Sequence, residues 1–164
     1  MFKKMFKKKE EVTDVSIHAP VNGILISLED VPDPVFSQKM MGNGIAVKPT
    51  DGVIVALVEG KVIQVFPTKH AIGIKAVNGA EILIHIGLDT VNLEGEGFIA
   101  HVQEGNSIKV GDKLITFDLD IISEKTKSIL TPVIITNTDD MEVIRLSEIK
   151  KVTAAQDEIL FVSK

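Results

Sequence analysis

Short apolar runs rich in valine and isoleucine, separated by turns with glycine, proline or asparagine, make up most of the 164-residue sequence. Runs of four to eight such residues bounded by turn residues are typical of β-strands. Only residues 120–128 combine apolar and charged positions with a helical period. The pattern predicts an all-β domain with one or two short helices. We expect strands over residues 24–28, 45–48, 53–57, 72–77, 80–86, 110–117, 131–136, 142–146 and 159–162.

Asn78 and Gly79, which lie between the runs 72–77 and 80–86, give the clearest hairpin signal in the chain. A two-residue type I′ turn needs a positive φ at both central positions, and asparagine and glycine adopt it most readily. We therefore expect the two runs to pair as strands around a two-residue loop. In that register the numbers of opposing residues add up to 157, which fixes the face of every side chain.

This register brings two of the four histidines together, because Ile72 would face His85. His70 would then share a face with Ile72 and His85, and the two imidazoles would be diagonal neighbours. Repulsion between like charges and partial desolvation disfavour two protonated rings, so at least one ring should be neutral near pH 7. A neutral imidazole is a nucleophile. The alternative is that each is a structural histidine on a solvated face.

The other two histidines stand apart from this pair. His18 lies beside an Ala-Pro turn and His101 in a short exposed strand, so both are interpreted as structural or surface residues. The region of His18 has a second copy, because residues 17–28 and 56–65 share an apolar run, a Val-x-Gly turn and a strand. Two copies of one pattern indicate an internally duplicated β-fold.

Residues 31–44 are expected to form a long loop, because Pro32 and Pro34 cannot lie in a central strand. Its apolar residues follow no strand period, and methionines are common on surfaces that bind several partners. These side chains either fill gaps in the core or form an exposed contact patch. They are Val35, Phe36, Met40 and Met41.

The first nine residues place Phe2, Met5 and Phe6 on one helical face among five lysines. So short a helix is marginal in water, and the segment is either a flexible basic tail or a weak membrane-surface contact. We divide the chain into this flexible tail, residues 1–14, and one globular domain, residues 15–164. With no apolar run of about 18 residues and no signal-peptide core, a soluble, cytoplasmic protein is expected.

Charge and composition limit the classes of partner and cofactor. The net charge of −5 disfavours nucleic acid, whose phosphates are bound by basic patches, and favours a basic protein partner. The chain has no cysteine, which excludes disulfides and thiolate metal sites. Two histidines are too few for a catalytic zinc, which usually takes three protein ligands. We therefore expect neither a metal nor a cofactor.

Two other chemistries fit the sequence poorly. A serine hydrolase would need a Gly-x-Ser-x-Gly elbow, which the chain lacks. Residues 104–114 resemble the turns of biotinyl and lipoyl carrier domains, which present a lysine on a tight hairpin, within Met-Lys-Met in the biotin type. Here the only similar run is Lys39-Met40-Met41, which has another residue order and lies in another loop. What remains is histidine as a covalent carrier, with phosphoryl as the group that a neutral imidazole accepts reversibly.

Six motifs between residues 17 and 162 resemble one known family in order and spacing, the glucose-type enzyme IIA components of the bacterial phosphoenolpyruvate-dependent sugar phosphotransferase system. One departure is Leu57, where the family often has proline. This position belongs to the internal repeat and not to the histidine site. The motifs are Asp33-Pro34-Val35-Phe36, Gly42-Asn43-Gly44-Ile45-Ala46-Val47-Lys48-Pro49, Thr68-Lys69-His70-Ala71, Ile84-His85-Ile86-Gly87-Leu88-Asp89-Thr90-Val91, Gly95-Glu96-Gly97-Phe98 and Leu130-Thr131-Pro132-Val133.

The resemblance implies an antiparallel β-sandwich or flattened barrel of the duplicated hybrid motif type. It also implies that His85 is phosphorylated through Nε2, with His70 as its neighbour and Thr68 as the residue that holds His70. Gly87 and Asp89 would border the phosphoryl group.

The resemblance further implies two protein partners. A phosphocarrier histidine protein would donate the phosphoryl group to His85, and an enzyme IIB component would accept it for sugar uptake. Asp33 and Asp89 would meet an arginine of the phosphocarrier. The alternative is a regulatory binding protein whose phosphorylation state gates its partners. The apolar docking surface expected around the histidines consists of Val35, Phe36, Met41, Phe66, Leu83 and Val91.

Overall fold

The computed structural model describes residues 11–145 and 151–164. Every run predicted as a strand contains one, and α2 occupies the predicted helix. The helical segments are η2 (Leu28–Asp30), α1 (Pro34–Ser37), η3 (Thr90–Leu93), α2 (Leu119–Lys125) and η4 (Thr138–Asp140). The strands are β1 (Asp14–His18), β2 (Gly23–Ser27), β3 (Asn43–Pro49), β4 (Val53–Val55), β5 (Gly60–Val65), β6 (Ala71–Ala76), β7 (Glu81–His85), β8 (Phe98–Ala100), β9 (Ser107–Ile108), β10 (Lys113–Phe117), β11 (Thr131–Ile135), β12 (Glu142–Arg145), β13 (Lys151–Val152) and β14 (Glu158–Ser163).

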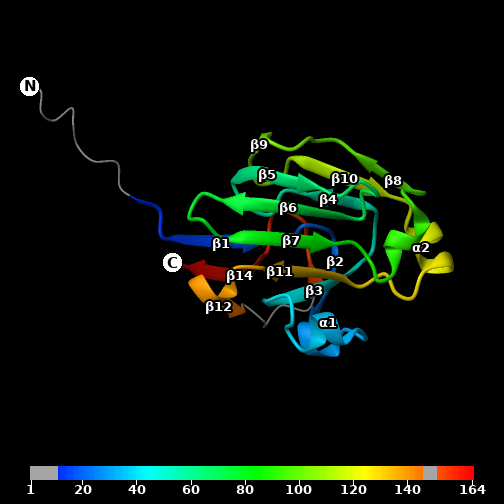
Figure 1. Cartoon of the computed structure of the whole chain (residues 1–164), viewed down its shortest axis with the longest axis horizontal. Coiled ribbons are helices and arrows are strands. Elements are labelled where there is room, and N and C mark those ends of the chain that lie inside the picture. Colours follow the sequence, from blue (N-terminus) through cyan, green and yellow to red (C-terminus); the bar gives the residue numbers. More distant parts are fainter. Residues whose placement is uncertain (1–10, 146–150) are drawn as a thin grey trace, which may run out of the picture.

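The strands form three antiparallel sheets, which confirms the predicted all-β fold (Figure 1). The largest has eight strands in the order β13-β2-β3-β11-β7-β6-β5-β9. The two smaller sheets have the orders β1-β14-β12 and β4-β10-β8. Over the described residues none of the sheets closes into a barrel.

The strand order repeats itself, as the two sequence copies predicted. The sheet β4-β10-β8 has the same plan as β1-β14-β12, and the half β9-β5-β6-β7 of the large sheet mirrors the half β13-β2-β3-β11. Ala19 and Ala56 occupy equivalent places at the ends of the two copies. The amide of Ala19 donates to the carbonyl of Asp157 at 2.8 Å, and the amide of Ala56 donates to that of Asp112 at 2.7 Å.

The large sheet is apolar on both faces, so its central strands carry no simple alternation of polar and apolar residues. Ile82 and Ile84 of β7 point into the main core, which also holds buried residues of the two smaller sheets. Leu83 lies on the opposite face, called here the outer face, in a smaller cluster with Phe36 and Ala71. The helical stretch from η2 to α1 covers this cluster next to β3 (Figure 1).

The hairpin at Asn78 and Gly79 forms, but its predicted register is wrong by one residue. Ala71 faces His85, so opposing numbers add up to 156, and the loop has three residues. Gly79 alone has a positive φ, +96°. Asn78 is buried, and its amide donates to the carbonyls of Thr13 and Val162 at 3.0 and 3.2 Å. A tertiary anchor therefore replaces the type I′ turn, giving the three-residue hairpin with glycine at its end.

The stretch 31–44, predicted as a loop without regular structure, contains the one-turn helix α1. Asp33 caps this helix by accepting the amide of Val35 at 3.0 Å. Pro34 occupies the first turn, where a backbone N–H has no helical partner to lose. The Asp33 cap and Pro34 together favour a helix at this position. The sequence interpretation used the prolines only to exclude a strand.

The predicted amphipathic segment, residues 1–9, lies outside the described residues. Within residues 11–145 and 151–164, no helix combines the length and the apolar character needed to cross a bilayer. β1 begins at Asp14, a residue that the sequence interpretation assigned to the tail. Lys164 lies beside the start of this strand, because its amide donates to the carbonyl of Thr13 at 2.8 Å.

Candidate functional site

His85 is the last residue of β7, and its side chain lies on the outer face of the large sheet. Leu83 precedes it on that face, and Ala71 is its register partner on β6. Both neighbours belong to the smaller apolar cluster. The imidazole is therefore held at the rim of an apolar patch, half-buried and still open to solvent. Ile72, predicted to share the face of His85, instead points into the main core.

His70 reaches the same place from a turn rather than from a strand. β6 begins only at Ala71, and Lys69 has a left-handed φ of +60°. The amide of Lys69 donates to the carbonyl of Phe66 at 2.7 Å, which closes this turn. The ring centroids of His70 and His85 lie 5.0 Å apart at an interplanar angle of 79°. The predicted histidine pair is confirmed, although the turn, not strand alternation, produces it.

A single hydrogen bond fixes the tautomer of His85. Its Nδ1 lies 2.8 Å from the carbonyl oxygen of Gly87. Because a carbonyl only accepts, Nδ1 must carry the proton, and the lone pair of the neutral ring is on Nε2. Gly87 has a φ of +72°, and a Cβ there would lie 2.7 Å from Cγ2 of Thr90. Glycine is therefore required to bring its carbonyl to the ring.

His70 is held from its other side by Thr68, whose Oγ1 lies 2.5 Å from Nδ1 of His70. Two phenylalanines flank the histidine pair. The ring centroid of Phe36 lies 5.1 Å from that of His85, and the ring centroid of Phe66 lies 5.6 Å from that of His70. Four rings thus stand in the order Phe36, His85, His70, Phe66, and this packing limits the orientations open to both imidazoles.

The surroundings keep both imidazoles uncharged. Burial, and after it the charge that His85 can carry, lowers the pKa of His70 to about 4. Burial also lowers the pKa of His85, although the Gly87 carbonyl and the negative charges of Asp33 and Asp89 oppose that shift. At neutral pH the pair therefore presents a neutral nucleophile, as the sequence predicted.

The six apolar residues predicted as an exposed docking surface divide into two groups. Three are exposed: Val35 by 39%, Met41 by 39% and Val91 by 49%. Phe36 and Leu83 are only 4% and 6% exposed, so their predicted exposure is wrong. They form the floor beneath the histidines, because the smaller cluster needs them to cover β3 and β7. Phe66 is half-buried beside His70.

One network near the site was not foreseen from the sequence. Arg145, the only arginine of the chain, binds Glu29 through two hydrogen bonds of 2.8 and 3.0 Å. Lys39 binds the same carboxylate at 3.1 Å. These contacts tie η2 and the end of the α1 stretch to β12, and so hold the segment that carries Asp33 and Phe36. The partners are far apart in sequence, and an isolated arginine gave no local signal.

The other predicted surface histidines lie away from the pair along the chain. His18 is in β1, where its Nε2 lies 4.0 Å from Glu158. His101 is exposed, and its Nε2 lies 3.0 Å from the hydroxyl of Thr116. Within the part of the chain that the structure describes, no three His, Cys, Asp or Glu residues come together as metal ligands would.

A comparison with protein families matches residues 15–141 to the model of the family described as phosphoenolpyruvate-dependent sugar phosphotransferase system, EIIA 1. Named relatives match along almost their whole length. The chain is 56% identical over 163 residues to a PTS system glucose-specific EIIA component of Oceanobacillus iheyensis, covering 99% of both chains. It is 53% identical over 163 residues to the protein of that name from Bacillus cereus, again covering 99% of both.

Among solved structures, the chain resembles a glucose permease IIA from Mycoplasma capricolum. The TM-score is 0.85 at 38% sequence identity, and the match covers 94% of this chain and 99% of that one. The similarity therefore extends over almost the whole of both chains.

Proposed function

The chain belongs to the EIIA 1 family of the phosphoenolpyruvate-dependent sugar phosphotransferase system, and we propose that His85 carries the phosphoryl group. It is a phosphoryl-carrier component of this system and hence a phosphotransferase. The name glucose-specific, which the relatives carry, supports glucose as the sugar that it serves. A cytoplasmic location fits this role, because phosphoenolpyruvate is a metabolite of that compartment.

The observation that carries the proposal is the bond from Nδ1–H of His85 to the Gly87 carbonyl. It leaves the Nε2 lone pair as the nucleophile. This lone pair forms a new P–N bond while the P–N bond to the donor's histidine breaks, and the donor nitrogen keeps that electron pair. The proton stays on Nδ1, so the carbonyl stabilises the positive charge that the ring gains. A bond of the same kind is broken and formed, so the transfer is reversible.

His70 is the proposed helper in this transfer. If the Thr68 hydroxyl donates to Nδ1, the proton of His70 is on Nε2, in a ring whose centroid lies 5.0 Å from that of His85. An N–H there can donate to an oxygen of the phosphoryl group, where charge is spread in the transition state. Burial that keeps His70 neutral also prevents it from repelling the incoming imidazole.

Two protein partners follow from the proposal. The donor is a phosphocarrier histidine protein, and the acceptor is an enzyme IIB component. The charges of Asp33 and Asp89 act on His85, so a basic side chain of either partner would meet negative potential there. The exposed residues Val35, Met41 and Val91 would bind the apolar part of both partners, as exposed apolar patches on monomers often do.

The experiment follows the phosphoryl group from phosphoenolpyruvate through this protein to enzyme IIB. The protein is incubated with labelled phosphoenolpyruvate, enzyme I and phosphocarrier protein, and purified enzyme IIB components are then added as acceptors. Label on the protein that passes to a glucose-type enzyme IIB supports the proposal. Label that stays on the protein with every acceptor would favour the alternative, a regulatory protein whose modification changes only what it binds. Failure to take up label would contradict both.

A further inference from the structure

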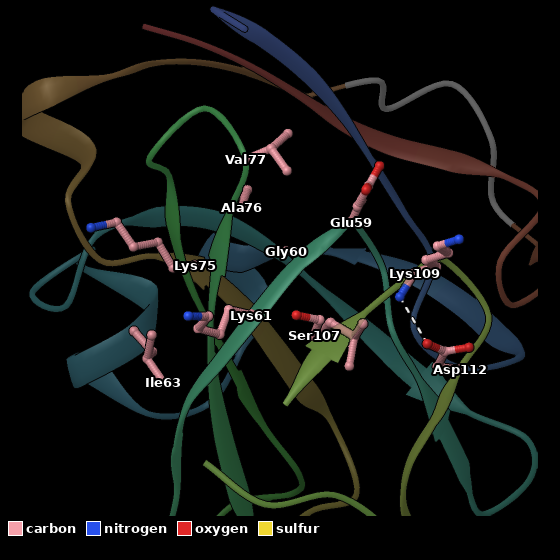
Figure 2. Close-up of a pocket in the computed structure, with 11 residues that line it drawn as sticks. Glu59, Gly60, Lys61, Ile63, Lys75, Ala76, Val77, Ser107, Lys109 and Asp112 are labelled. Atoms are coloured by element: carbon pink, nitrogen blue, oxygen red, sulfur yellow. Dashed lines mark hydrogen bonds between the residues drawn. The ribbon is translucent and has the colours of Figure 1, made fainter. Parts of the chain in front are cut away.

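A hollow lies on the outer face of the large sheet near its β9 edge, over strands β6, β5 and β9 (Figure 2). Its volume is about 550 Å³, within the range of pockets that hold small molecules. Ile108 is buried beneath it, and the half-exposed side chains of Ile63 and Val77 line it. None of the residues assigned to phosphoryl transfer lines this hollow, so it is a separate feature of the molecule.

Two lysines stand directly opposite each other in this hollow. Lys61 of β5 pairs with Lys75 of β6, and on its other side Lys61 pairs with Ser107 of β9. Residues at directly opposed positions have their side chains on one face and within about 5 Å of each other at Cβ. Like charges in that relation repel each other and destabilise a sheet. Lys75, Lys61 and Ser107 thus stand side by side on β6, β5 and β9, and none of the three side chains carries a negative charge.

The carboxylates that line the hollow, Glu59 and Asp112, form no ion pair with these two lysines. Figure 2 shows Lys61 and Lys75 on one side of the hollow, and Asp112, Lys109 and Glu59 toward the other. Asp112 accepts the backbone amide of Lys109 at 2.8 Å, which commits it to its own turn.

Glu81 of β7 is the register partner of Lys75 on its other side, directly opposed to it as Lys61 is, but it does not line the hollow. Among the described residues, no ion pair engages Lys61, Lys75 or Lys109. Three lysines and two carboxylates, Glu59 and Asp112, therefore line the hollow, which gives it a small positive excess on a chain whose net charge is −5.

We propose that this hollow binds a small organic phosphate monoester. The charge of a phosphate dianion matches that of two lysines at opposed positions, and lysine binds phosphate as a point charge. The hydroxyl of Ser107 supplies a third donor next to Lys61. The exposed apolar side chains of Ile63 and Val77 would cover a compact body attached to the phosphate. A carboxylate would satisfy only one of the two lysine charges.

The test uses three probes on the full-length protein labelled with ¹⁵N. Phenyl phosphate carries both the anion and an apolar body, inorganic phosphate has only the anion, and benzyl alcohol has only the body. Phenyl phosphate should shift the amides of Gly60, Ala76 and Ile108, and should bind more tightly than either other probe. Shifts confined to Gly87 and Leu88 would mean binding at the histidines instead, and would overturn the inference.

Lys61→Gln and Lys75→Gln test which residues hold the anion. Each should weaken phenyl phosphate about tenfold, the usual effect of losing one charge-assisted hydrogen bond. Lys48→Gln is the matched control, because Lys48 is an exposed strand lysine outside the hollow and should change nothing.

If the two lysines only discourage aggregation at the end of the sheet, the variants will lose solubility while binding stays unchanged. Equal binding by wild type and both variants would contradict the proposal. Phosphoryl acceptance at the histidines is measured separately, and its outcome does not affect this result.

Discussion

The Nδ1–H of His85 and the Gly87 carbonyl show how one backbone group can set the chemistry of a side chain. A free imidazole exchanges its proton between two nitrogens, whereas this carbonyl holds the proton on one of them. His70 differs, because its Nδ1 meets a hydroxyl that can either donate or accept. The two rings are close in space but have unequal partners, which predicts unequal roles.

Replacing His85 with Gln should abolish uptake of label from the phosphocarrier, because it removes the proposed nucleophile. Replacing His70 with Gln should leave labelling possible, since the nucleophile stays, but should slow passage to enzyme IIB by at least about tenfold. Rapid-quench measurement of labelled protein and labelled acceptor separates the two steps. Normal labelling of the His85 variant, with none of the His70 variant, would reverse the assignment.

His70 should also make stability depend on pH. Its pKa is about 4 in the folded chain and about 6.5 when unfolded, so below pH 6.5 the unfolded state binds the extra proton. The free energy of unfolding should therefore fall by about 3 kcal/mol as the pH drops from 6.5 to 4. Urea titrations should show this slope in wild type and much less of it in His70→Gln. Parallel slopes would show that burial does not perturb the ring.

At the scale of elements, the short segment after β7 positions the site through its backbone. Gly87 has a φ of +72°, and a Cβ there would approach Thr90 and the carbonyl of Ser128. Gly87→Ala should destabilise the fold by about 2–3 kcal/mol and slow phosphoryl uptake, because the carbonyl must shift away from His85.

The matched control is Gly105→Ala. Gly105 has a φ of +93° but no atom within 4 Å of an added Cβ, so only the backbone cost of about 1 kcal/mol applies. Its phosphoryl uptake should equal that of wild type. Urea denaturation measures the loss of stability, and labelling rates measure phosphoryl uptake. Equal losses of stability and of uptake in the two variants would show that the close packing around Gly87 does not affect function.

Arg145 and Glu29 join two elements that the sequence alone does not connect. Hydrogen bonds from Arg145 hold the pKa of Glu29 at about 2, so the pair stays charged under all ordinary conditions. Arg145→Met should speed hydrogen exchange at Val35 and Phe36 and slow transfer between partners. Global stability should change by at most about 1 kcal/mol, because the pair is partly exposed.

Lys125→Met is the control for this variant. It breaks another exposed ion pair, with Glu96, whose atoms are 3.0 Å apart. Exchange at α1 should not change there. Equal exchange at α1 in wild type and Arg145→Met would mean that packing of Phe36 alone holds the helix.

At the scale of the whole molecule, the strands and the duplication could be predicted because each leaves a local pattern, and the histidine pair because both histidines stand beside the predicted hairpin. The hairpin register could not be predicted, because the side-chain amide of Asn78 donates hydrogen bonds to the distant carbonyls of Thr13 and Val162. Similarly, Phe36 and Leu83 look like surface residues beside a site, yet the second apolar cluster buries them. Contacts between distant segments decide both cases, and no local window contains them.

The central claim is that the fold presents Nε2 of His85 as the phosphoryl acceptor. It is tested most directly by NMR of the protein labelled with ¹⁵N-histidine, after phosphorylation by phosphoenolpyruvate, enzyme I and phosphocarrier protein. We predict one phosphoryl group, coupled to Nε2 of His85, with the proton still on Nδ1 and bound to the Gly87 carbonyl. A phosphoryl group on Nδ1 of His85, or on either nitrogen of His70, would contradict it.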